Sequence, residues 1–297
     1  MINVLSLFDG IGCGLLALER VGFDKGIYFA SEIDYNAIKI ANRYSYNTKI
    51  VRSIVGDVRE LDGNLFRVPI DLLIGGSPCQ SFSNVISNNT GFEGKSGLFY
   101  AYVRILKEVK PEYFLLENVM MKHEWMGIIT KELGVEPIMI DSTDFSAQSR
   151  RRLYWSNIPI PEITNKSKSV INDILYTGKI PEKYYYKNDY KLINSGNIEA
   201  ELDINIHEMH KRVYNKNSKC ATLTAVCGGN QQKKILDGNR VRKLLPIEYE
   251  RLQTIPEDYT GGFSDSSRYK MLGNAWTVDV IAHIFKGIDK SFISAHV

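Results

Sequence analysis

Short apolar runs alternate with segments of helical periodicity through the first half of the chain. Five apolar runs, each ended by glycine, proline or polar residues, predict strands at residues 2–8, 26–31, 70–74, 112–116 and 135–140. Apolar residues at helical spacing predict helices at residues 12–21, 36–44 and 98–109. This alternation predicts an α/β, Rossmann-like fold. Its sheet would be mostly parallel and twisted, with helices on both faces and ligands at the carboxyl ends of the strands.

The pattern changes after Pro159. Residues 160–240 are rich in Lys, Asn, Tyr and Ile and show no helical period, which predicts a small irregular or β-rich domain. Helical spacing returns at residues 246–252 and 278–285. We therefore expect a first domain, a second domain and a C-terminal segment that returns to the first, at residues 1–159, 160–255 and 256–297.

Positive charge is concentrated in one stretch of the sequence. The 297 residues carry a net charge of only +3, and their 44% hydrophobic and 24% charged content is that of an ordinary soluble protein. Residues 207–243 hold nine Lys or Arg and two acidic residues, a net +7 that leaves −4 for the rest of the chain. A phosphate backbone could lie along this stretch, although a solvated basic face without a ligand has the same composition.

The cysteines and the N-terminus argue against several classes of protein. Cys13, Cys79, Cys220 and Cys227 have no Cys-x-x-Cys spacing, so we expect neither a zinc site nor a disulfide framework. Free thiols fit a reducing compartment. No apolar stretch approaches the length of a membrane span, and the first residues lack the basic start of a signal peptide.

The segment around Cys79 joins a predicted buried strand to a stiff turn. The apolar run at residues 70–74 ends at two glycines, and Pro78 restricts both its own backbone and that of Ser77. A thiol held there is placed to act as a nucleophile, whereas a lone cysteine is more often a small buried apolar residue. The polar, glycine-containing residues 80–94 that follow predict a lid over a bound substrate.

The turns after the first strands predict a nucleoside site. The sequence Phe8-Asp9-Gly10-Ile11-Gly12-Cys13-Gly14 follows the first strand. Glu32 ends the second strand, where a carboxylate can bind a ribose hydroxyl, and Asp57 after the next apolar segment could bind an adenine amino group. The glycine spacing differs from the Gly-x-Gly-x-x-Gly of dinucleotide enzymes, which argues against an NAD-dependent oxidoreductase.

Charged side chains lie near two further strand ends. Glu117 follows the apolar run at residues 113–116, so its carboxyl should lie in the same crevice as Cys79. It could hydrogen-bond or protonate a polar heterocycle, or it could cap the next helix. Arg150 and Arg152 share one side of an extended segment, with Arg151 on the other. Two guanidiniums suit a phosphate or a polarised carbonyl oxygen, and a surface basic cluster is the alternative.

Together these residues resemble the DNA cytosine-5 methyltransferase family along nearly the whole chain, apart from about residues 160–210. The family's blocks occur in order as Phe8-x-Gly10-x-Gly12, Glu32, Asp57, Pro78-Cys79-Gln80, Glu117-Asn118-Val119, Gln148-x-Arg150-x-Arg152, Ala221-Thr222-Leu223-Thr224, Arg242, Glu250-Arg251-Leu252-Gln253 and Gly273-Asn274. Further blocks resemble the catalytic domain of the mammalian de novo methyltransferases, namely Ser31-Glu32-Ile33, Gly56-Asp57-Val58-Arg59, Ile140-Asp141 and Trp276. Without a long regulatory extension, the chain resembles a stand-alone bacterial or phage enzyme. Ser77 departs from the pattern, since many bacterial members have proline there.

The resemblance implies S-adenosylmethionine as cofactor and double-stranded DNA as substrate. The Cys79 thiolate would add to C6 of a flipped-out cytosine, so that C5 accepts the methyl group. Glu117 would bond N3 and the exocyclic amine, Arg152 would bond O2, and Arg150 would help hold Cys79 or the nucleotide and favour the thiolate. The implied cofactor residues are Phe8, Gly10, Gly12, Glu32, Ile33, Asp57, Val58, Pro78, Leu98, Asn274 and Trp276. The expected DNA contacts are Gln80, Ser81, Thr222, Leu223, Lys233 and Arg240, the last four within a target-recognition domain at residues 160–255.

Two rival functions stay open within this resemblance. One is tRNA methylation, although Cys220-Ala221-Thr222 is a poor stand-in for the Cys-Phe-Thr signature of that branch. The other is a catalytically silent DNA-binding relative, against which the intact Cys79, Glu117 and Arg152 argue. We further expect a cytoplasmic monomer of a bacterium or phage-infected cell, without metal or membrane, and with a cognate restriction endonuclease as a candidate partner.

Overall fold

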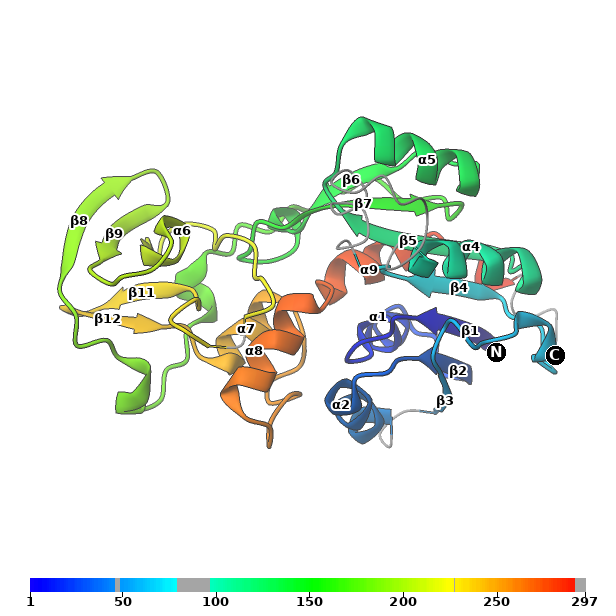
Figure 1. The fold of residues 1–297 in the computed structure, drawn as a ribbon, viewed down its shortest axis with the longest axis horizontal. Coiled ribbons are helices and arrows are strands. Elements are labelled where there is room, and N and C mark those ends of the chain that lie inside the picture. Colours follow the sequence, from blue (N-terminus) through cyan, green and yellow to red (C-terminus); the bar gives the residue numbers. More distant parts are fainter. Residues whose placement is uncertain (46–48, 79–96, 227, 292–297) are drawn as a thin grey trace. The chain divides into compact units, whose positions relative to one another are not determined.

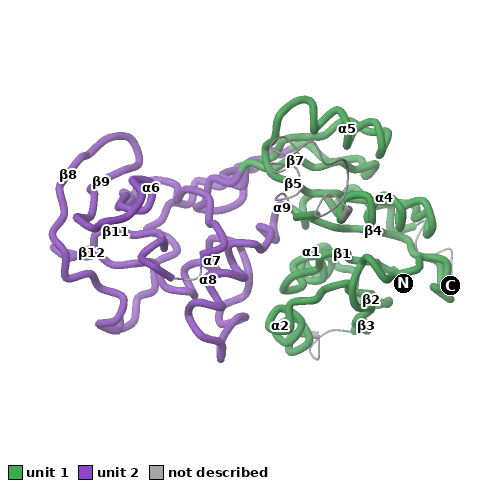
Figure 2. The backbone as a smooth tube through the Cα atoms, viewed as in Figure 1, with its two compact units in different colours: residues 1–140, 151–162, 281–297 green, residues 141–150, 163–280 purple. Residues whose placement is uncertain are grey.

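The chain divides into two compact units. The structure is a computed structural model that describes residues 1–45, 49–78, 97–226 and 228–291. Unit 1 comprises residues 1–140, 151–162 and 281–297, and unit 2 comprises residues 141–150 and 163–280 (Figure 2). Cys79, Gln80, Ser81 and the rest of the expected lid lie outside the described residues.

Unit 1 is built on a mostly parallel sheet, as the sequence predicts (Figure 1). Its strands are β1 (Ile2–Leu7), β2 (Gly26–Ser31), β3 (Ile50–Gly56), β4 (Leu72–Gly75), β5 (Tyr113–Val119), β6 (Ile138–Asp141) and β7 (Arg151–Ser156). They lie in the order β3-β2-β1-β4-β5-β7-β6. The pairs from β3 to β5 are parallel, and β5 pairs with β7 in antiparallel orientation. The parallel part brings the carboxyl ends of β1, β2, β4 and β5 to one edge of the sheet.

Helices cover both faces of this sheet, and its apolar strands are therefore buried on both sides. The helices of the first half are α1 (Cys13–Arg20), α2 (Tyr35–Ser45), α4 (Gly97–Val109) and α5 (His123–Leu133). Leu5 and Leu73 share an apolar cluster with side chains of α4 and α5. On the opposite face α1 packs so closely that a Cβ on Gly14 would lie 2.4 Å from Ile74 Cδ1 and 2.7 Å from the Tyr28 hydroxyl oxygen. Leu73 and Ile74 are consecutive, so they point to opposite faces.

The structure corrects the sequence prediction at the end of β5. The apolar run predicts a strand that stops at Leu116, with Glu117 beyond it. The strand instead continues to Val119, because Leu115–Val119 pair residue by residue with Ser156–Arg152 of β7. Strand β3 and helix α5 were not predicted as elements, and β6 begins three residues later than expected. Glu117 is therefore held by a sheet register rather than by a turn.

Unit 2 contains a smaller sheet, which agrees with the predicted β-rich region. Its strands are β8 (Tyr190–Ser195), β9 (Ile198–Leu202), β10 (Arg212–Tyr214), β11 (Lys234–Asp237) and β12 (Arg240–Lys243), in the order β12-β11-β10-β9-β8. A small cluster of Ala200, Leu202, Val213, Leu236 and Val241 forms its core. The remaining helices are α6 (Glu208–Lys211), α7 (Pro246–Leu252), α8 (Asp265–Asn274) and α9 (Val278–Phe285), with short 3-10 turns at Gly63–Leu65, Ser142–Asp144, Ile171–Ile174 and Glu182–Tyr184.

Buried polar bonds hold residues 256–280 within unit 2. The Glu250 carboxylate of α7 accepts from the peptide N–H groups of Asp258 and Thr260, at 2.8 and 2.9 Å, and from the Arg268 guanidinium of α8 at 3.0 Å. Arg242 of β12 forms two hydrogen bonds of 2.8 Å to the Glu248 carboxylate, which is fully buried. The contacts thus group α7 and α8 with the small sheet, whereas residues 281–297 belong to unit 1.

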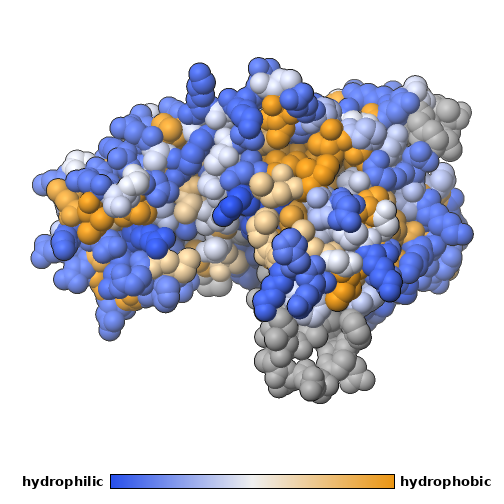
Figure 3. Space-filling model, turned by 90° about the horizontal axis from the view of Figure 1, so that it is seen from above, coloured by the Kyte–Doolittle hydropathy of each residue, from blue (hydrophilic) through white to orange (hydrophobic). Residues whose placement is uncertain are grey.

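One face of the protein is mostly polar. Hydrophilic side chains cover much of the face seen in Figure 3, and apolar side chains form several patches among them. On unit 1, Met120, Ile138 and Met139 are each about half exposed. The last two belong to β6, an edge strand of only four residues, and so short an edge limits pairing with a second chain. In the described part of the chain, no helix has the length and apolar character that a bilayer crossing requires.

A buried ion pair joins the first three strands of unit 1. Asp9 follows β1, and its Oδ1 accepts from the hydroxyls of Ser6 at 2.7 Å and Tyr28 at 2.6 Å. Its Oδ2 lies 2.5 Å from the Arg52 guanidinium of β3, and both side chains are at most 1% exposed. Burial, together with the Asp9 charge, raises the pKa of the Tyr28 phenol far above its ordinary value. Because Asp9 begins the glycine loop, this network fixes the position at which the loop leaves the sheet.

We expect the substitution Asp9→Asn to destabilise the protein strongly, because it leaves the Arg52 guanidinium buried without a counter-charge. The expected loss is about 3–5 kcal/mol in the free energy of unfolding, measured by urea denaturation. Lys107→Met is the control, since it removes an ion pair with Glu132 whose lysine side chain is 67% exposed. That variant should lose less than about 1 kcal/mol. Equal losses in the two variants would show that the Asp9 network contributes no more than a surface pair.

Candidate active site

The glycine loop after β1 has an unusual backbone conformation. Phe8 has a φ of 57°, which is costly for a side-chain-bearing residue, and Gly10 has a φ of 58°. A Cβ on Gly10 would meet no atom within 4 Å, so the conformation rather than close packing calls for glycine there. Gly12, with a φ of 81°, precedes α1. The loop therefore places left-handed backbone directly before the N-terminus of α1.

Glu32 fixes this loop to the end of β2. Its Oε2 accepts from the Gly10 N–H at 2.7 Å, and its Oε1 accepts from the N–H groups of Ile33 and Asp34, both at 2.8 Å. Each carboxylate oxygen can accept more than one hydrogen bond, so Glu32 can still bind a hydroxyl. The Ile33 side chain beside it is 70% exposed, which is unusual for isoleucine and leaves an apolar surface next to the carboxylate.

The turn after β3 carries the second acidic residue of the predicted nucleoside site. Arg59 binds Asp57 through its Nε, at 3.1 Å from Oδ1 and 3.0 Å from Oδ2, and lowers the pKa of that carboxyl. The Ser31 hydroxyl donates to the Gly56 carbonyl at 2.8 Å, and Arg104 of α4 donates to the Val58 carbonyl at 3.1 Å. The turn is thus tied to β2 on one side and to α4, which carries Leu98, on the other.

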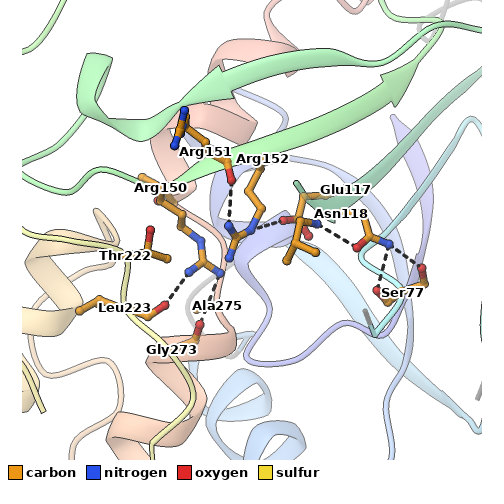
Figure 4. Close-up of polar contacts among 12 residues, drawn as sticks. Ser77, Glu117, Asn118, Arg150, Arg151, Arg152, Thr222, Leu223, Gly273 and Ala275 are labelled. Carbon is orange, nitrogen blue, oxygen red and sulfur yellow. Dashed lines mark hydrogen bonds and ion pairs between the residues drawn. The ribbon is translucent and has the colours of Figure 1, made fainter. Parts of the chain in front are cut away.

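The adjacent ends of β4 and β5 are linked by a buried amide. Asn118 Nδ2 lies 3.2 Å from the Ser77 hydroxyl and 3.4 Å from the Ser77 carbonyl oxygen, and both residues are at most 4% exposed (Figure 4). The Asn118 Oδ1 accepts from the Val119 N–H at 2.8 Å, which fixes the orientation of the amide. Pro78 follows Ser77 directly. The residue before the proline is therefore bound to Asn118 of the neighbouring strand β5.

Glu117 and Arg152 form a partly buried ion pair on one face of the sheet (Figure 4). Arg152 Nε lies 3.0 Å from Glu117 Oε1, and the two side chains are 14% and 10% exposed. The register pairs Val119 with Arg152 and Glu117 with Tyr154, which puts the two charged side chains on the same face. Arg152 Nη1 also donates to the Arg151 carbonyl at 2.8 Å. The structure therefore brings together the two charged groups that the sequence proposed for one ring.

Arg150 belongs to unit 2, where its guanidinium binds backbone. Its Nη1 donates to the Leu223 carbonyl at 2.9 Å and its Nη2 to the Gly273 carbonyl at 3.3 Å (Figure 4). The side chain is nearly buried, with the residue 6% exposed. These bonds make Arg150 a brace for the segments at Leu223 and Gly273. A Cβ on Gly273 would lie 2.2 Å from the Thr224 carbonyl oxygen, so glycine is required for this close approach.

Two fully buried glutamines connect the same segments. Gln148 Nε2 donates to Gln253 Oε1 at 3.0 Å, and Gln148 Oε1 accepts from the Leu223 N–H at 2.8 Å. Gln253 Nε2 donates to the carbonyls of Leu272 and Ala275, at 2.9 and 3.1 Å. Both glutamines appear in the sequence blocks, but the sequence suggested no role for them. Their partners lie up to 105 residues away, a pairing that no local pattern reveals.

The predicted DNA contacts in unit 2 differ in accessibility. Thr222 is half-buried and its hydroxyl donates to the Ser149 carbonyl at 2.8 Å, while Leu223 is 1% exposed. Arg240 forms an ion pair with Glu182, and its guanidinium lies 4.1 Å from the centre of the Tyr185 ring.

Lys233 does not offer a charge at the surface. The residue is 8% exposed and its ammonium lies over the Tyr214 ring. A phosphate contact requires an accessible ammonium, and the buried Lys233 does not provide one. Asn274 is exposed at the end of α8, and Trp276 is half-buried close behind it.

The described cysteines have no catalytic environment. Burial raises the pKa of the Cys220 thiol to about 12, so it stays protonated and unreactive at neutral pH. Cys13 is also buried. Among the described residues there is no group of three or more His, Cys, Asp or Glu that could hold a metal ion.

The chain is similar to DNA methyltransferases over nearly its full length. The family model for C-5 cytosine-specific DNA methylases matches residues 2–290. The chain is 28% identical to the type II methyltransferase M.Eco47II of Escherichia coli, over 96% of this chain and 78% of that protein. It is 26% identical to the orphan methyltransferase M.SPRI of Bacillus phage SPR, over 99% and 98%.

The fold agrees with a solved structure. The crystal structure of the Schizosaccharomyces pombe Dnmt2 methyltransferase superimposes with a TM-score of 0.69 at 18% identity, over 96% of this chain and 99% of that one. At this identity the likeness shows the shared fold. The match of the family model to residues 2–290 establishes the relationship itself: the chain belongs to the C-5 cytosine-specific DNA methylase family and is a DNA (cytosine-5)-methyltransferase.

Proposed function

We propose that this protein transfers a methyl group from S-adenosylmethionine to C5 of a flipped-out cytosine in double-stranded DNA, through a covalent bond between Cys79 and C6. Family membership supports the reaction class. The observation that carries the mechanism is the Glu117–Arg152 pair, held at 3.0 Å on β5 and β7 beside the strand end that leads to Cys79. A carboxyl and a guanidinium in that position suit the polar edge of a pyrimidine.

The residues of unit 1 fit the cofactor. S-adenosylmethionine would supply an electrophilic methyl group on a sulfonium. Glu32 would accept from the ribose hydroxyls, Asp57 from the adenine amino group, and the exposed Ile33 would cover one face of the adenine. Phe8, Gly10, Gly12, Val58, Pro78 and Leu98 would complete the site on unit 1. Asn274 and Trp276 belong to unit 2, and their assignment to the cofactor stays a prediction.

The chemistry follows from the weak nucleophilicity of cytosine C5. The Cys79 thiolate adds to C6, and the electrons of the C5–C6 double bond move toward C5, which then takes the methyl group. Glu117 accepts from the exocyclic amine and gives a proton to N3 as negative charge develops there, while Arg152 donates to O2. Loss of the C5 proton to water restores the C5–C6 double bond and expels the thiolate, and the proton on N3 returns to Glu117. These groups cannot reach a base inside a duplex, so the nucleotide must be flipped out.

Methyl transfer with labelled cofactor tests the function. The wild-type protein should label duplex DNA, and Cys79→Ala should abolish the labelling. Cys220→Ala is the matched control and should retain activity, because the Cys220 thiol is buried and its pKa is raised to about 12. In duplexes that carry 5-fluorocytosine the C5 fluorine cannot leave as a proton, so a protein–DNA adduct should accumulate with wild type and not with Cys79→Ala. Labelling of tRNA in place of DNA, or full activity in Cys79→Ala, would refute the proposal.

Glu117→Gln and Arg152→Lys should each lower kcat by about 10²- to 10³-fold. Glutamine cannot pass a proton to N3, and lysine cannot bind the carboxyl and O2 with a planar fork. The affinity for S-adenosylmethionine, measured by calorimetry, should stay within about twofold of wild type. Arg151→Lys is the control, because the Arg151 side chain is exposed and its carbonyl is unchanged by the substitution. A similar loss in all three variants would point to damage of β7 rather than to the pair.

Asn118→Ala should reduce the reactivity of Cys79, although we expect no direct contact between Asn118 and the substrate. The variant removes the side-chain amide that donates to the Ser77 hydroxyl and carbonyl, at 3.2 and 3.4 Å, so the turn through Pro78 loses this anchor. We expect kcat to fall by about tenfold, together with the rate at which a small alkylating reagent modifies the Cys79 thiol. In a Ser77→Pro background, where the ring stiffens the turn, the effect of Asn118→Ala should be smaller. An equal loss of kcat in both backgrounds would show that Asn118 does not act through Ser77.

A further inference from the structure

Lys234 of β11 holds an ammonium group inside unit 2, and among the residues that the structure describes no acidic side chain forms an ion pair with it. The residue is 0% exposed. Its Nζ donates to three backbone carbonyls, those of His210 at 2.6 Å, Asn230 at 2.6 Å and Gln232 at 2.9 Å. An ammonium has three N–H donors, and a buried charge is tolerated only when such donors are satisfied. Here every donor has an acceptor, and the acceptors come from two separate segments.

The two segments are further linked at the same point. The backbone of Gln231 favours the protonated form of the His210 ring, while burial and the charges of Lys234 and Lys233 lower the pKa of that ring. Lys234 also lies over the Tyr186 ring at 5.4 Å. Burial and the neighbouring Lys233 and Lys243 lower the pKa of Lys234 to about 7. Hydrogen bonds to three carbonyl oxygens need all three N–H donors of the ammonium form. The residue thus joins the turn at residues 207–210 to the loop at residues 228–232.

The exposed groups of the joined segments suit the edge of a nucleic acid base. His207 and Asn230 are exposed, and Gln231 is half-buried. The one acidic residue of α6, Glu208, is exposed and forms an ion pair with Lys211 at 3.0 Å. The backbone of the loop is compact, with φ values of 146° at Gly228 and 63° at both Gly229 and Asn230. A loop with glycines can approach a groove closely, and asparagine or glutamine can form two hydrogen bonds to adenine.

We propose that Lys234 joins residues 207–210 and 228–232 into one rigid surface that reads base edges in duplex DNA, with Asn230 contacting an adenine of the recognition sequence. This inference rests on the proposed function. A flexible loop would lose conformational entropy when it docks, whereas a loop held in place by three backbone bonds discriminates between sequences at a smaller cost. Lys234 is a positioning residue in this scheme, because its ammonium does not reach the DNA.

Lys234→Met tests the link, and Lys243→Met is its matched control. Lys243 lies directly opposite Lys234 in the β11–β12 pair, so both substitutions remove one positive charge from the same place in the sheet. Lys243 faces the Tyr184 ring instead of loop carbonyls. In Lys234→Met, hydrogen exchange of the amides at residues 207–211 and 228–232 should rise together by at least about tenfold. Lys243→Met should leave both segments unchanged.

Specificity gives the functional readout. Methylated positions in DNA from cells expressing the wild type define the recognition sequence, and kcat/KM is then compared between that site and duplexes with one pair changed. Lys234→Met should lower this discrimination by about tenfold at several positions, with S-adenosylmethionine affinity unchanged. Asn230→Gly keeps the left-handed backbone and should lower discrimination by about tenfold at a single A·T pair.

Several results would overturn the inference. Equal exchange and equal discrimination in Lys234→Met and Lys243→Met would remove the role of Lys234. If Lys234→Met does not fold, unchanged discrimination at every position in Asn230→Gly would remove the base-reading role of the loop. A wild-type protein that methylates RNA and not DNA would overturn the proposed function and this inference together. Normal DNA methylation with unchanged specificity in both variants would overturn this inference alone.

Discussion

The register between β5 and β7 determines which charged side chains meet at the edge of the sheet in unit 1. In this antiparallel pair Glu117 lies opposite Tyr154, and Val119 lies opposite Arg152, so the carboxylate and the guanidinium share a face and meet at 3.0 Å. A shift of one residue would send Glu117 to the opposite face, into the apolar cluster formed with α4 and α5. The same strand places Asn118 on Ser77, so one pairing aligns both polar contacts.

Buried polar side chains tie the irregular segments of unit 2 together. The small sheet has a cluster of five buried apolar residues, and Gln148, Gln253, Glu248 and Glu250 are all 0% exposed. Each of them is hydrogen-bonded to backbone or to an arginine, so none is buried without compensation. Irregular segments with few ladder bonds need such side chains, because their backbone groups must find partners elsewhere. Substitutions at these glutamines would therefore loosen several distant segments at once.

The sequence predicted most of the parallel part of the sheet, though not β3, because the other strands there have a local signature. The apolar runs at β1, β2 and β4 and the helical period of α4 all lie close to the observed elements. The extent of β5 was predicted wrongly, since its last residues are held by β7, more than 30 positions further along the chain. The pairing of β5 with β7 is a tertiary contact, and local strand propensity does not predict it.

The same limit applies to the candidate site. The resemblance assigned Glu117 and Arg152 to one ring, but nothing in the sequence indicated the bracing contacts of Arg150 and the two glutamines. Lysine is among the residues that are almost never fully buried, so nothing in the sequence distinguished Lys233 and Lys234 from solvent-exposed neighbours. Burial is decided by the surrounding chain, and only the three-dimensional arrangement shows which cations face inward.

The inward-facing cations lower the salt dependence expected for polyanion binding to the basic stretch at residues 207–243. Of the nine Lys and Arg between residues 207 and 243, Lys233, Lys234 and Arg242 are buried and bound to the protein itself. Cations that face inward cannot displace counterions from a phosphate backbone, and each phosphate contact contributes about 0.9 to the slope of log affinity against log salt. Binding of a polyanion to this region should therefore weaken with added salt less steeply than the charge count of the sequence suggests.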